Sequence, residues 1–314
     1  MPHQQTFTPP LRIGTRGSQL ALAQAYELRR RICASTGVDE TAVEIVVIST
    51  TGDRVTDRPL AEIGGKGLFT LEIEEQLSDG RIDMAVHSSK DMPTVLPEGL
   101  ELSCFLPRES VADAFVSRTA RRFGDLAKGA VVGTSSLRRQ AQLLRVRPDL
   151  TIVGFRGNVQ TRLRKLEEGV AEATLLAHAG LKRLEMDHVV CELLPLDEFV
   201  PAPGQGAICV ETRTGDAVTE AVLGPINDGD TAIALSAERA FLRVLDGSCR
   251  TPLAGHAKVD GTKLHFHGVV LSPDGSKVHE TRMSADLSEA IGCGEAAGEK
   301  LRKDAGAGFF SDWS

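Results

Sequence analysis

Hydrophobic residues follow two spacings along this chain, and the two spacings alternate. Short apolar runs are typical of buried strands, and they occur at 11–14, 43–48, 82–86, 100–106, 114–116, 130–133, 151–155, 173–177 and 208–211. Apolar positions three or four residues apart are typical of amphipathic helices. They follow most of these runs and return at 232–245 and 287–303. Strands and helices in regular alternation predict open α/β sheets with parallel strands.

The order of these elements predicts three domains. Two sections of the chain have the same alternation of strands and helices, although their sequences are not repeats of each other. The Pro/Gly-rich segment 201–206 then precedes a strand that we expect to rejoin the first sheet. We therefore expect a discontinuous α/β domain at 1–106 with 207–226 and a second α/β domain at 107–206. A smaller α+β domain is expected at 227–314, from two helices and from strands near 264–271 and 277–283.

Composition narrows the class of protein. The 314 residues are 25% charged and 41% hydrophobic, which is ordinary for a globular protein. No apolar run is long enough to cross a membrane, and the first ten residues lack the apolar segment of a signal peptide. The six cysteines are scattered without a CxxC pair, which argues against zinc and disulfides and fits a reducing cytosol. We therefore expect a cytoplasmic monomer that binds no membrane.

Charge is distributed unevenly. The net charge is −7, but the segment from Arg138 to Lys165 holds eight basic residues against the single acid Asp149. A local basic block in an acidic protein favours a small anionic ligand over a polyanion. For some members a solvated helix face is the simpler interpretation, namely Arg145, Arg147, Arg164 and Lys165. A nucleic-acid partner is not expected, because the chain has one Trp and one Tyr for stacking on bases.

Charged and polar residues stand just after several predicted strands. They are Arg16 and Ser18 after 11–14, Lys90 and Asp91 after 82–86, Arg156 after 151–155, and Arg183 in the helix after 173–177. Ligands of open α/β sheets bind at the carboxyl ends of the strands. A solvated ion pair is the alternative for Lys90 and Asp91. Arg138 and Arg139 fall in the first turn of a helix that we expect Thr134 or Ser135 to cap. The helix dipole disfavours cations there, which indicates a bound anion.

The loop after the helix at 232–245 holds a candidate nucleophile. Gly247 ends that helix, and Cys249 follows before Pro252. The neighbouring Arg250 favours the thiolate, which is the reactive form of cysteine. The alternative is a small buried hydrophobic residue, the commoner role of a single cysteine. Further on, His265 and His267 share one face of a strand, but no third ligand is spaced to join them, so no metal is expected.

Eight motifs, in order from about Leu11 to Pro252, resemble the porphobilinogen deaminase family. They are IGTRGSQLALAQ, GGKGLF, DMAVHSSKDMP, VGTSSLRRQAQL, FRGNVQTRL, LAHAGLKRL, PAPGQGA and AERAFLRVLDGSCRTP. The resemblance implies two domains built like those of periplasmic binding proteins, flanking a cleft, and a smaller α+β domain that carries the cofactor cysteine. Beyond Pro252 the match is weak.

The resemblance also implies residue roles. Cys249 would hold one dipyrromethane cofactor per chain through a thioether, and Asp91 would be the catalytic carboxylate. The residues that would bind the cofactor are Lys90, Ser136, Arg138, Arg139, Arg162 and Arg183. Those that would bind substrate are Arg16, Ser18, Arg156, Lys66, Phe69 and Gln205. The polar, Gly-rich segment 50–67 would be a lid over the cleft, with Lys66 and Phe69 near its base.

The reaction implied by the resemblance accounts for these residue types. Four porphobilinogen molecules are condensed head to tail with loss of ammonia, and water then releases hydroxymethylbilane, a precursor of tetrapyrroles such as haem. Each pyrrole carries an acetate and a propionate, and arginine pairs with carboxylates through two parallel hydrogen bonds. Loss of ammonia leaves a cationic azafulvene, which Asp91, as a buried carboxylate, would stabilise. No metal is required.

A non-catalytic two-domain binding protein for small dicarboxylates is the main alternative. It explains the arginines but gives Cys249 and Asp91 nothing to do. Such proteins also usually carry an export signal, which the first ten residues do not resemble.

Overall fold

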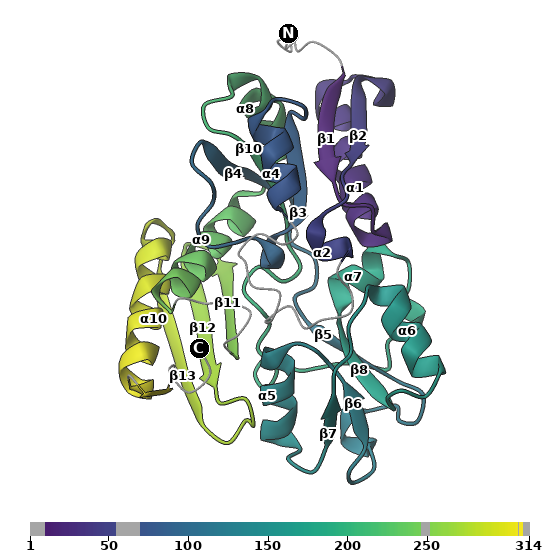
Figure 1. Ribbon diagram of the computed structural model, residues 1–314. Helices are drawn as coiled ribbons and strands as arrows, with labels where there is room; N and C mark the ends of the chain where they lie inside the picture. Colours follow the sequence, from purple (N-terminus) through teal and green to yellow (C-terminus); the bar gives the residue numbers. More distant parts are fainter. Residues whose placement is uncertain (1–9, 55–69, 246–251, 307, 310–314) are drawn as a thin grey trace. The chain divides into compact units, whose positions relative to one another are not determined.

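The computed structural model describes residues 10–54, 70–245, 252–306 and 308–309 (Figure 1). The chain groups into two compact units. The first unit is Met1–Glu109 with Ala207–Ala232, and the second is Ser110–Gly206 with Ile233–Ser314.

The first unit is built on a five-stranded sheet of order β2-β1-β3-β10-β4. Its strands are β1 (Leu11–Thr15), β2 (Val43–Val47), β3 (Met84–Ser88), β4 (Leu100–Phe105) and β10 (Ile208–Arg213). Its helices are α1 (Gln19–Thr36), α2 (Thr51–Arg54), α4 (Leu71–Ser78) and α8 (Ala217–Leu223). β1 pairs in parallel with β2 and β3, whereas β10 runs antiparallel between β3 and β4. The segment at 208–211 therefore returns to the first sheet, as predicted.

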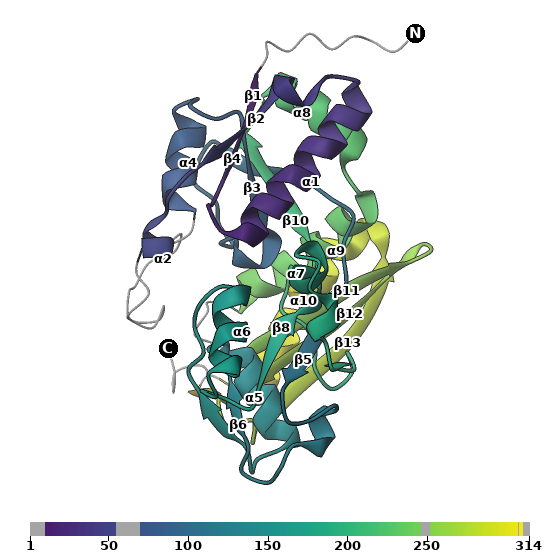
Figure 2. The same cartoon turned by 90° about the vertical axis from the view of Figure 1, so that its right-hand side faces the viewer.

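Both faces of this sheet are covered. Leu28 and Ile32 of α1 and Val222 of α8 pack on one face, and Ile73 and Leu77 of α4 pack in a separate cluster with Ile82 and Ala85. Figure 2 shows α1 and α8 on one side of these strands and α4 on the other. Parallel strands that are covered on both faces have continuous apolar sequences. The apolar runs in the sequence therefore predicted these strands.

The second unit contains a sheet of the same design, of order β7-β6-β8-β5-β9. Its strands are β5 (Asp113–Ser117), β6 (Val131–Gly133), β7 (Thr151–Val153), β8 (Ala173–Ala177) and β9 (Glu192–Leu193). Its helices are α5 (Leu137–Val146), α6 (Val159–Glu167) and α7 (His178–Arg183). β6 pairs in parallel with β7 and β8, and β5 runs antiparallel to β8. α5 packs on one face, while α6 and α7 pack on the other.

The rest of the second unit is a three-stranded antiparallel sheet covered by two helices. It comprises α9 (Gly229–Val244), β11 (Leu253–Asp260), β12 (Lys263–Leu271), β13 (Val278–Asp286) and α10 (Ala290–Ala305). The first four residues of α9 are grouped with the first unit. Phe241 of α9 and Ala297 of α10 pack with Phe266 in one core. A second cluster joins Ala141 of α5 to Ala254 and Val269 of this sheet. α5 therefore packs against both sheets of the unit.

Single 3₁₀ turns complete the described structure, at Glu40–Ala42, Ser89–Asp91, Phe123–Asp125, Asp187–Val189, Gly224–Ile226 and Leu287–Glu289. The predicted fold class is confirmed, since the chain has two α/β sheets with helices on both faces and a smaller α+β part. The three sheets lie in the three predicted ranges, but contacts define two units. The division into three domains stays a prediction.

Four local expectations were wrong. The run at 43–48 forms an edge strand rather than a buried one, because β2 has a neighbour on one side only and Val47 is 56% exposed. The predicted loop at 50–67 begins with the short helix α2. Ser136, rather than Thr134 or Ser135, caps α5. Strand β11 was missed, since its sequence LAGHAKVD mixes small and polar residues.

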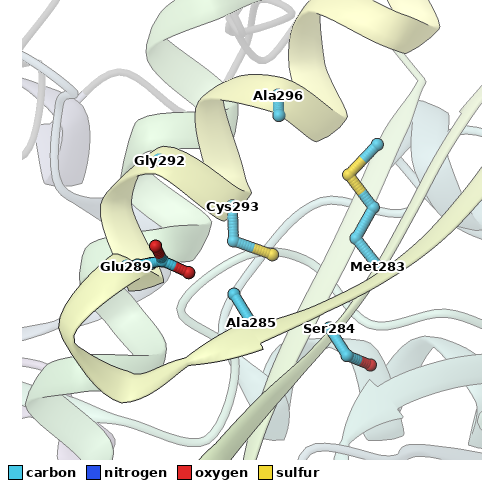
Figure 3. Close-up of a pocket in the computed structure, with 7 residues that line it drawn as sticks. All are labelled: Met283, Ser284, Ala285, Glu289, Gly292, Cys293 and Ala296. Atoms are coloured by element: carbon cyan, nitrogen blue, oxygen red, sulfur yellow. The ribbon is translucent and has the colours of Figure 1, made fainter.

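Two glycines of α10 differ in their surroundings and give a test of its packing. A Cβ atom at Gly294 would overlap the backbone of Ala237 in α9. A Cβ atom at Gly292 would meet nothing within 4 Å, because Gly292 borders an open surface pocket beside β13 (Figure 3). We expect Gly294→Ala to destabilise the protein by about 1–3 kcal/mol. Gly292→Ala should be neutral or stabilise it by up to about 1 kcal/mol, since alanine is the better helix former.

Urea unfolding of the two variants beside the wild type measures this difference. Equal midpoints for Gly294→Ala and Gly292→Ala would show that α9 and α10 do not pack through the backbone at Gly294.

Candidate active site

In the first unit, Arg16 and Ser18 follow β1 at its carboxyl end. The Ser18 hydroxyl accepts a hydrogen bond from the backbone nitrogen of Ala21 at 3.2 Å and caps α1. Arg16 is half-buried beside it. α1 also contacts β3, because the Gln24 amide donates a hydrogen bond to the Ser88 hydroxyl at 2.8 Å.

Lys90 and Asp91 lie in the 3₁₀ turn that directly follows β3. The backbone nitrogen of Ser89 donates to the Ala207 carbonyl at 3.0 Å, which fixes the start of this turn to the chain entering β10. Lys90 and Asp91 are exposed. The expectation that the Asp91 carboxylate is buried was therefore wrong. The buried Ser89 hydroxyl has no hydrogen-bond partner among the described residues.

In the second unit, two arginines converge on one buried carboxylate. Nη1 of Arg138 lies 2.8 Å from Oδ2 of Asp113, and Nη2 and Nε of Arg139 lie 2.7 and 3.1 Å from Oδ1. The side chains of Asp113, Arg138 and Arg139 are 0%, 5% and 6% exposed. The anion that the helix position of these arginines indicated is, in this structure, a side chain of the protein itself.

The charge state of Asp113 follows from these partners. Burial alone would raise the pKa of its carboxyl, but the charges of Arg138 and Arg139 outweigh burial and hold the pKa well below its usual range. Sequence reasoning missed Asp113, because it opens the apolar run DAFVS and reads as an ordinary strand end.

The segment that leaves the second unit is held by the same group. The amide nitrogen of the fully buried Gln205 donates to the Val111 carbonyl at 2.7 Å and to Oδ1 of Asp113 at 3.0 Å. Nη2 of Arg183 donates to the Gly206 carbonyl at 3.0 Å. These contacts tie the incoming chain at Val111 to the outgoing chain at Gln205.

Two further candidates, Ser136 and Arg156, follow the ends of β6 and β7, and a third, Arg162, lies in α6. Ser136 caps α5 by accepting from the backbone nitrogen of Arg139 at 3.4 Å. Nε of Arg162 donates to the Gly157 carbonyl at 2.9 Å. Nη1 of Arg156 is buried, and within the described parts of the chain it has no hydrogen-bond partner. A buried guanidinium nitrogen without a partner is suited to an anionic ligand.

Two of the arginines and lysines interpreted as solvated have structural contacts instead. Nζ of Lys165 donates to the Arg156 carbonyl at 3.0 Å. Arg147 pairs with Asp149 at 2.7 Å and also donates to the Leu126 carbonyl. Those expectations were wrong because both side chains donate to backbone carbonyls of other segments. Arg164, which pairs with Glu168 on an exposed helix face, fits the solvated interpretation, as does Arg145, which is partly exposed near Glu280.

The predicted nucleophile Cys249 lies outside the described residues, as do Lys66 and Phe69. Burial raises the thiol pKa of Cys33 and Cys293, and that of Cys104 to about 12. These three thiols are therefore unsuited to act as thiolates at neutral pH.

The two histidines of β12 have protein partners. His265 pairs with the Ser284 hydroxyl at 2.8 Å and His267 with the Glu280 carboxylate at 2.9 Å. Across the residues that the structure describes, no group of histidine, cysteine and carboxylate side chains is arranged to hold a metal ion. None of the described helices is both long and apolar enough to span a bilayer.

The fold defines an α/β protein with two open sheets. Each unit presents cations after the carboxyl ends of its parallel strands. Two family models match the chain. "Porphobilinogen deaminase, dipyromethane cofactor binding domain" covers residues 11–221, and "Porphobilinogen deaminase, C-terminal domain" covers 232–303. The chain belongs to the porphobilinogen deaminase family.

A curated relative supports the same conclusion. The porphobilinogen deaminase of Paracoccus denitrificans (strain Pd 1222) is 57% identical over 305 residues, which is 97% of each chain. The family predicted from the eight motifs is therefore confirmed, and the C-terminal model extends the match beyond Pro252.

Solved structures of substrate-binding proteins are distantly similar. The methionine binding protein MetQ aligns with a TM-score of 0.45 and 14% identity over 76% of this chain and 95% of its own. A nutrient binding protein from Burkholderia cenocepacia, bound to methionine, aligns with a TM-score of 0.42 and 12% identity over 68% and 90%.

Proposed function

We propose that this protein is a hydroxymethylbilane synthase, a transferase whose reaction is assisted by the side chains described above. It condenses four porphobilinogen molecules head to tail onto a covalently bound dipyrromethane, with loss of ammonia, and hydrolysis then releases hydroxymethylbilane. The observation that carries the activity is the 57% identity to a porphobilinogen deaminase along 97% of both chains.

The described residues fit a dipyrromethane. When bound, this group supplies the pyrrole carbon to which substrate is joined, and its side chains are carboxylates. The buried Nη1 of Arg156 and Nε of Arg138 have no partner among the described residues, and both are donors suited to such carboxylates. Their geometry therefore supports a ligand rich in carboxylates and would not suit a neutral one.

We assign cofactor binding to Lys90, Ser136, Arg138, Arg139, Arg162 and Arg183, and covalent attachment to Cys249. Substrate binding is assigned to Arg16, Ser18, Arg156, Lys66, Phe69 and Gln205. The support differs between residues. Arg16 and Arg156 follow strand ends, whereas Ser18 and Ser136 already cap helices. Cys249, Lys66 and Phe69 are assigned from the motifs LDGSCRTP and GGKGLF.

Asp91 is proposed as the catalytic carboxylate. The C–N bond of the substrate aminomethyl group breaks and ammonia leaves with the bonding electron pair, after taking up a proton. The pyrrole then carries a positive charge, which the Asp91 carboxylate stabilises from the turn after β3. When bound, the dipyrromethane would supply the pyrrole ring carbon that joins the substrate carbon, and Asp91 would accept the proton that this ring carbon loses. Exposure of Asp91 leaves room for substrate.

We also propose that the enzyme works as a monomer in the cytoplasm. The described cysteines, Cys33, Cys104, Cys191, Cys209 and Cys293, form no disulfide with one another, as is usual in a reducing compartment. Light scattering after gel filtration should give a mass near 33.6 kDa. A mass near twice that value would contradict the monomer.

A turnover assay separates the enzyme from a dicarboxylate-binding protein. Incubation with porphobilinogen should release one ammonia for each molecule consumed, and the product should be hydroxymethylbilane. Saturable binding of porphobilinogen without ammonia release, by protein that carries its cofactor, would favour the binding protein.

A further inference from the structure

The segment Val200–Gly206 connects the second unit to β10 and is held on two sides. We call it the connecting segment. On the side of the α/β sheet, the Val200 carbonyl accepts from Nη1 of Arg138 at 2.8 Å and from the Gln142 amide at 3.2 Å. The contacts of Gln205 and Arg183 follow further along. The side chains of Arg138, Gln142 and Arg183 therefore depend on where this segment lies, and Gln205 is part of it.

The other side of the connecting segment lies against β11. β11 is an edge strand of the C-terminal sheet, and edge strands leave backbone donors unpaired unless something covers them. The Gly255 nitrogen donates away from β12 to the Pro201 carbonyl at 3.0 Å. A Cβ atom at Gly255 would lie 3.2 Å from Cγ of Pro203, so the segment sits directly on this edge.

Glu238 joins the connecting segment to that edge. This residue of α9 is 0% exposed. Its Oε2 accepts from the backbone nitrogen of Gly204 at 2.6 Å, and its Oε1 accepts from that of Ala257 at 2.8 Å. Hydrogen bonds to a buried carboxylate are short and strong. One side chain therefore satisfies a donor of the segment and a donor of the strand together.

Gly204 has the backbone geometry that this contact needs. Its φ is +76°, a conformation that glycine adopts without strain. The turn that it forms is closed by the Gln205 nitrogen, which donates to the Ala202 carbonyl at 2.9 Å. The hydrogen bond from Gly204 to Glu238 thus fixes the position of the backbone at Gln205.

We propose that Glu238 is a positioning residue for the carboxylate-binding arginines. It fixes the connecting segment, and the segment in turn fixes Gln205, Arg183 and the buried group of Asp113 with Arg138 and Arg139. Glu238 itself touches neither cofactor nor substrate. The inference rests on the proposed roles of these arginines.

Glu238→Gln is the direct test, because glutamine keeps the shape but turns an NH₂ group toward one of the two backbone donors. We expect the variant to load less covalent cofactor, read as the fraction of intact protein carrying the added mass. We also expect KM for porphobilinogen to rise about 10- to 100-fold, as for other misplacements of binding groups, with kcat changed far less.

Gly294→Ala is the matched control. It strains the packing of α10 on the backbone of Ala237, the neighbour of Glu238 in α9, but keeps the Glu238 carboxylate. Its KM and cofactor loading should match the wild type. If Gly294→Ala raises KM as much as Glu238→Gln does, Glu238 is merely structural and the inference fails.

Two further variants cover the remaining outcomes. Should Glu238→Gln not fold, Gly255→Ala presses on Pro203 of the same segment as well as on the Phe241 ring, and it should raise KM in the same direction. An unchanged KM overturns the inference. Arg183→Ala tests the proposed function separately. An unchanged KM and loading in Arg183→Ala contradict the assignment of that arginine, whereas an effect there without one in Glu238→Gln contradicts only the inference.

Discussion

Asp91→Asn should fold normally and lose about 10²- to 10⁴-fold in kcat, the range reported for loss of a general acid–base group or of one electrostatic donor. The amide has the shape of the carboxylate but carries no charge, so it neither stabilises the cation left by ammonia loss nor accepts the ring proton. Folding should be intact because Asp91 is exposed, in a single turn after β3. Steady-state rates of hydroxymethylbilane formation, normalised to cofactor content, measure the effect.

Glu98→Gln supplies the control for this measurement. Glu98 is an exposed carboxylate of the same unit, and its neutralisation changes net charge equally without touching the proposed chemistry. Turnover of Asp91→Asn equal to that of Glu98→Gln would contradict the role of Asp91.

Asp113→Asn should produce the largest loss of stability. The substitution leaves the buried guanidinium groups of Arg138 and Arg139 without their counter-charge, and breaking a buried ion pair in this way costs about 3–5 kcal/mol. Asp197→Asn is the control, because its pair with Arg282 is exposed and such pairs contribute about 0–1 kcal/mol. Urea unfolding of both variants measures the difference. Equal small losses would mean that Arg138 and Arg139 are compensated elsewhere.

The pH dependence of stability gives Asp113 a second signature. The pKa of its carboxyl is lower in the folded protein than in the unfolded chain, so folding favours the charged form. Its contribution is therefore complete above the unfolded pKa of about 3.9 and is lost as pH falls toward the folded pKa. The free energy of unfolding of the wild type should fall below about pH 4. In Asp113→Asn it should depend less on pH in this range.

The sheets were predictable from sequence because their strands are buried on both faces and read as apolar runs. The return of 208–211 to the first sheet was predictable for a related reason, since the Pro/Gly-rich segment before it separates that strand from the second sheet. β11 was not predictable, because an edge strand covered by the connecting segment needs no apolar alternation. The cap of α5 was missed because three hydroxyl residues, Thr134, Ser135 and Ser136, stand in a row.

The arginines of the candidate site could be predicted from the sequence, but the buried carboxylates that contact its backbone and side chains could not. Arg16, Arg156 and Arg183 could be found because each follows a strand in sequence. Asp113 and Glu238 could not, since each meets its partners across long stretches of chain, 25 residues for Arg138 and 34 for Gly204. Such contacts depend on tertiary packing, which no local pattern encodes.

The mass of the intact, denatured protein, followed by peptide mapping, tests the central claim most directly. We expect a covalent excess equal to two linked pyrrole units, confined to the peptide that contains Cys249, and no excess in Cys249→Ser. Protein isolated without the excess should gain it at Cys249 on incubation with porphobilinogen. If no mass is ever added at Cys249, or if it is added at another residue, the assignment of Cys249 as the dipyrromethane attachment site is contradicted.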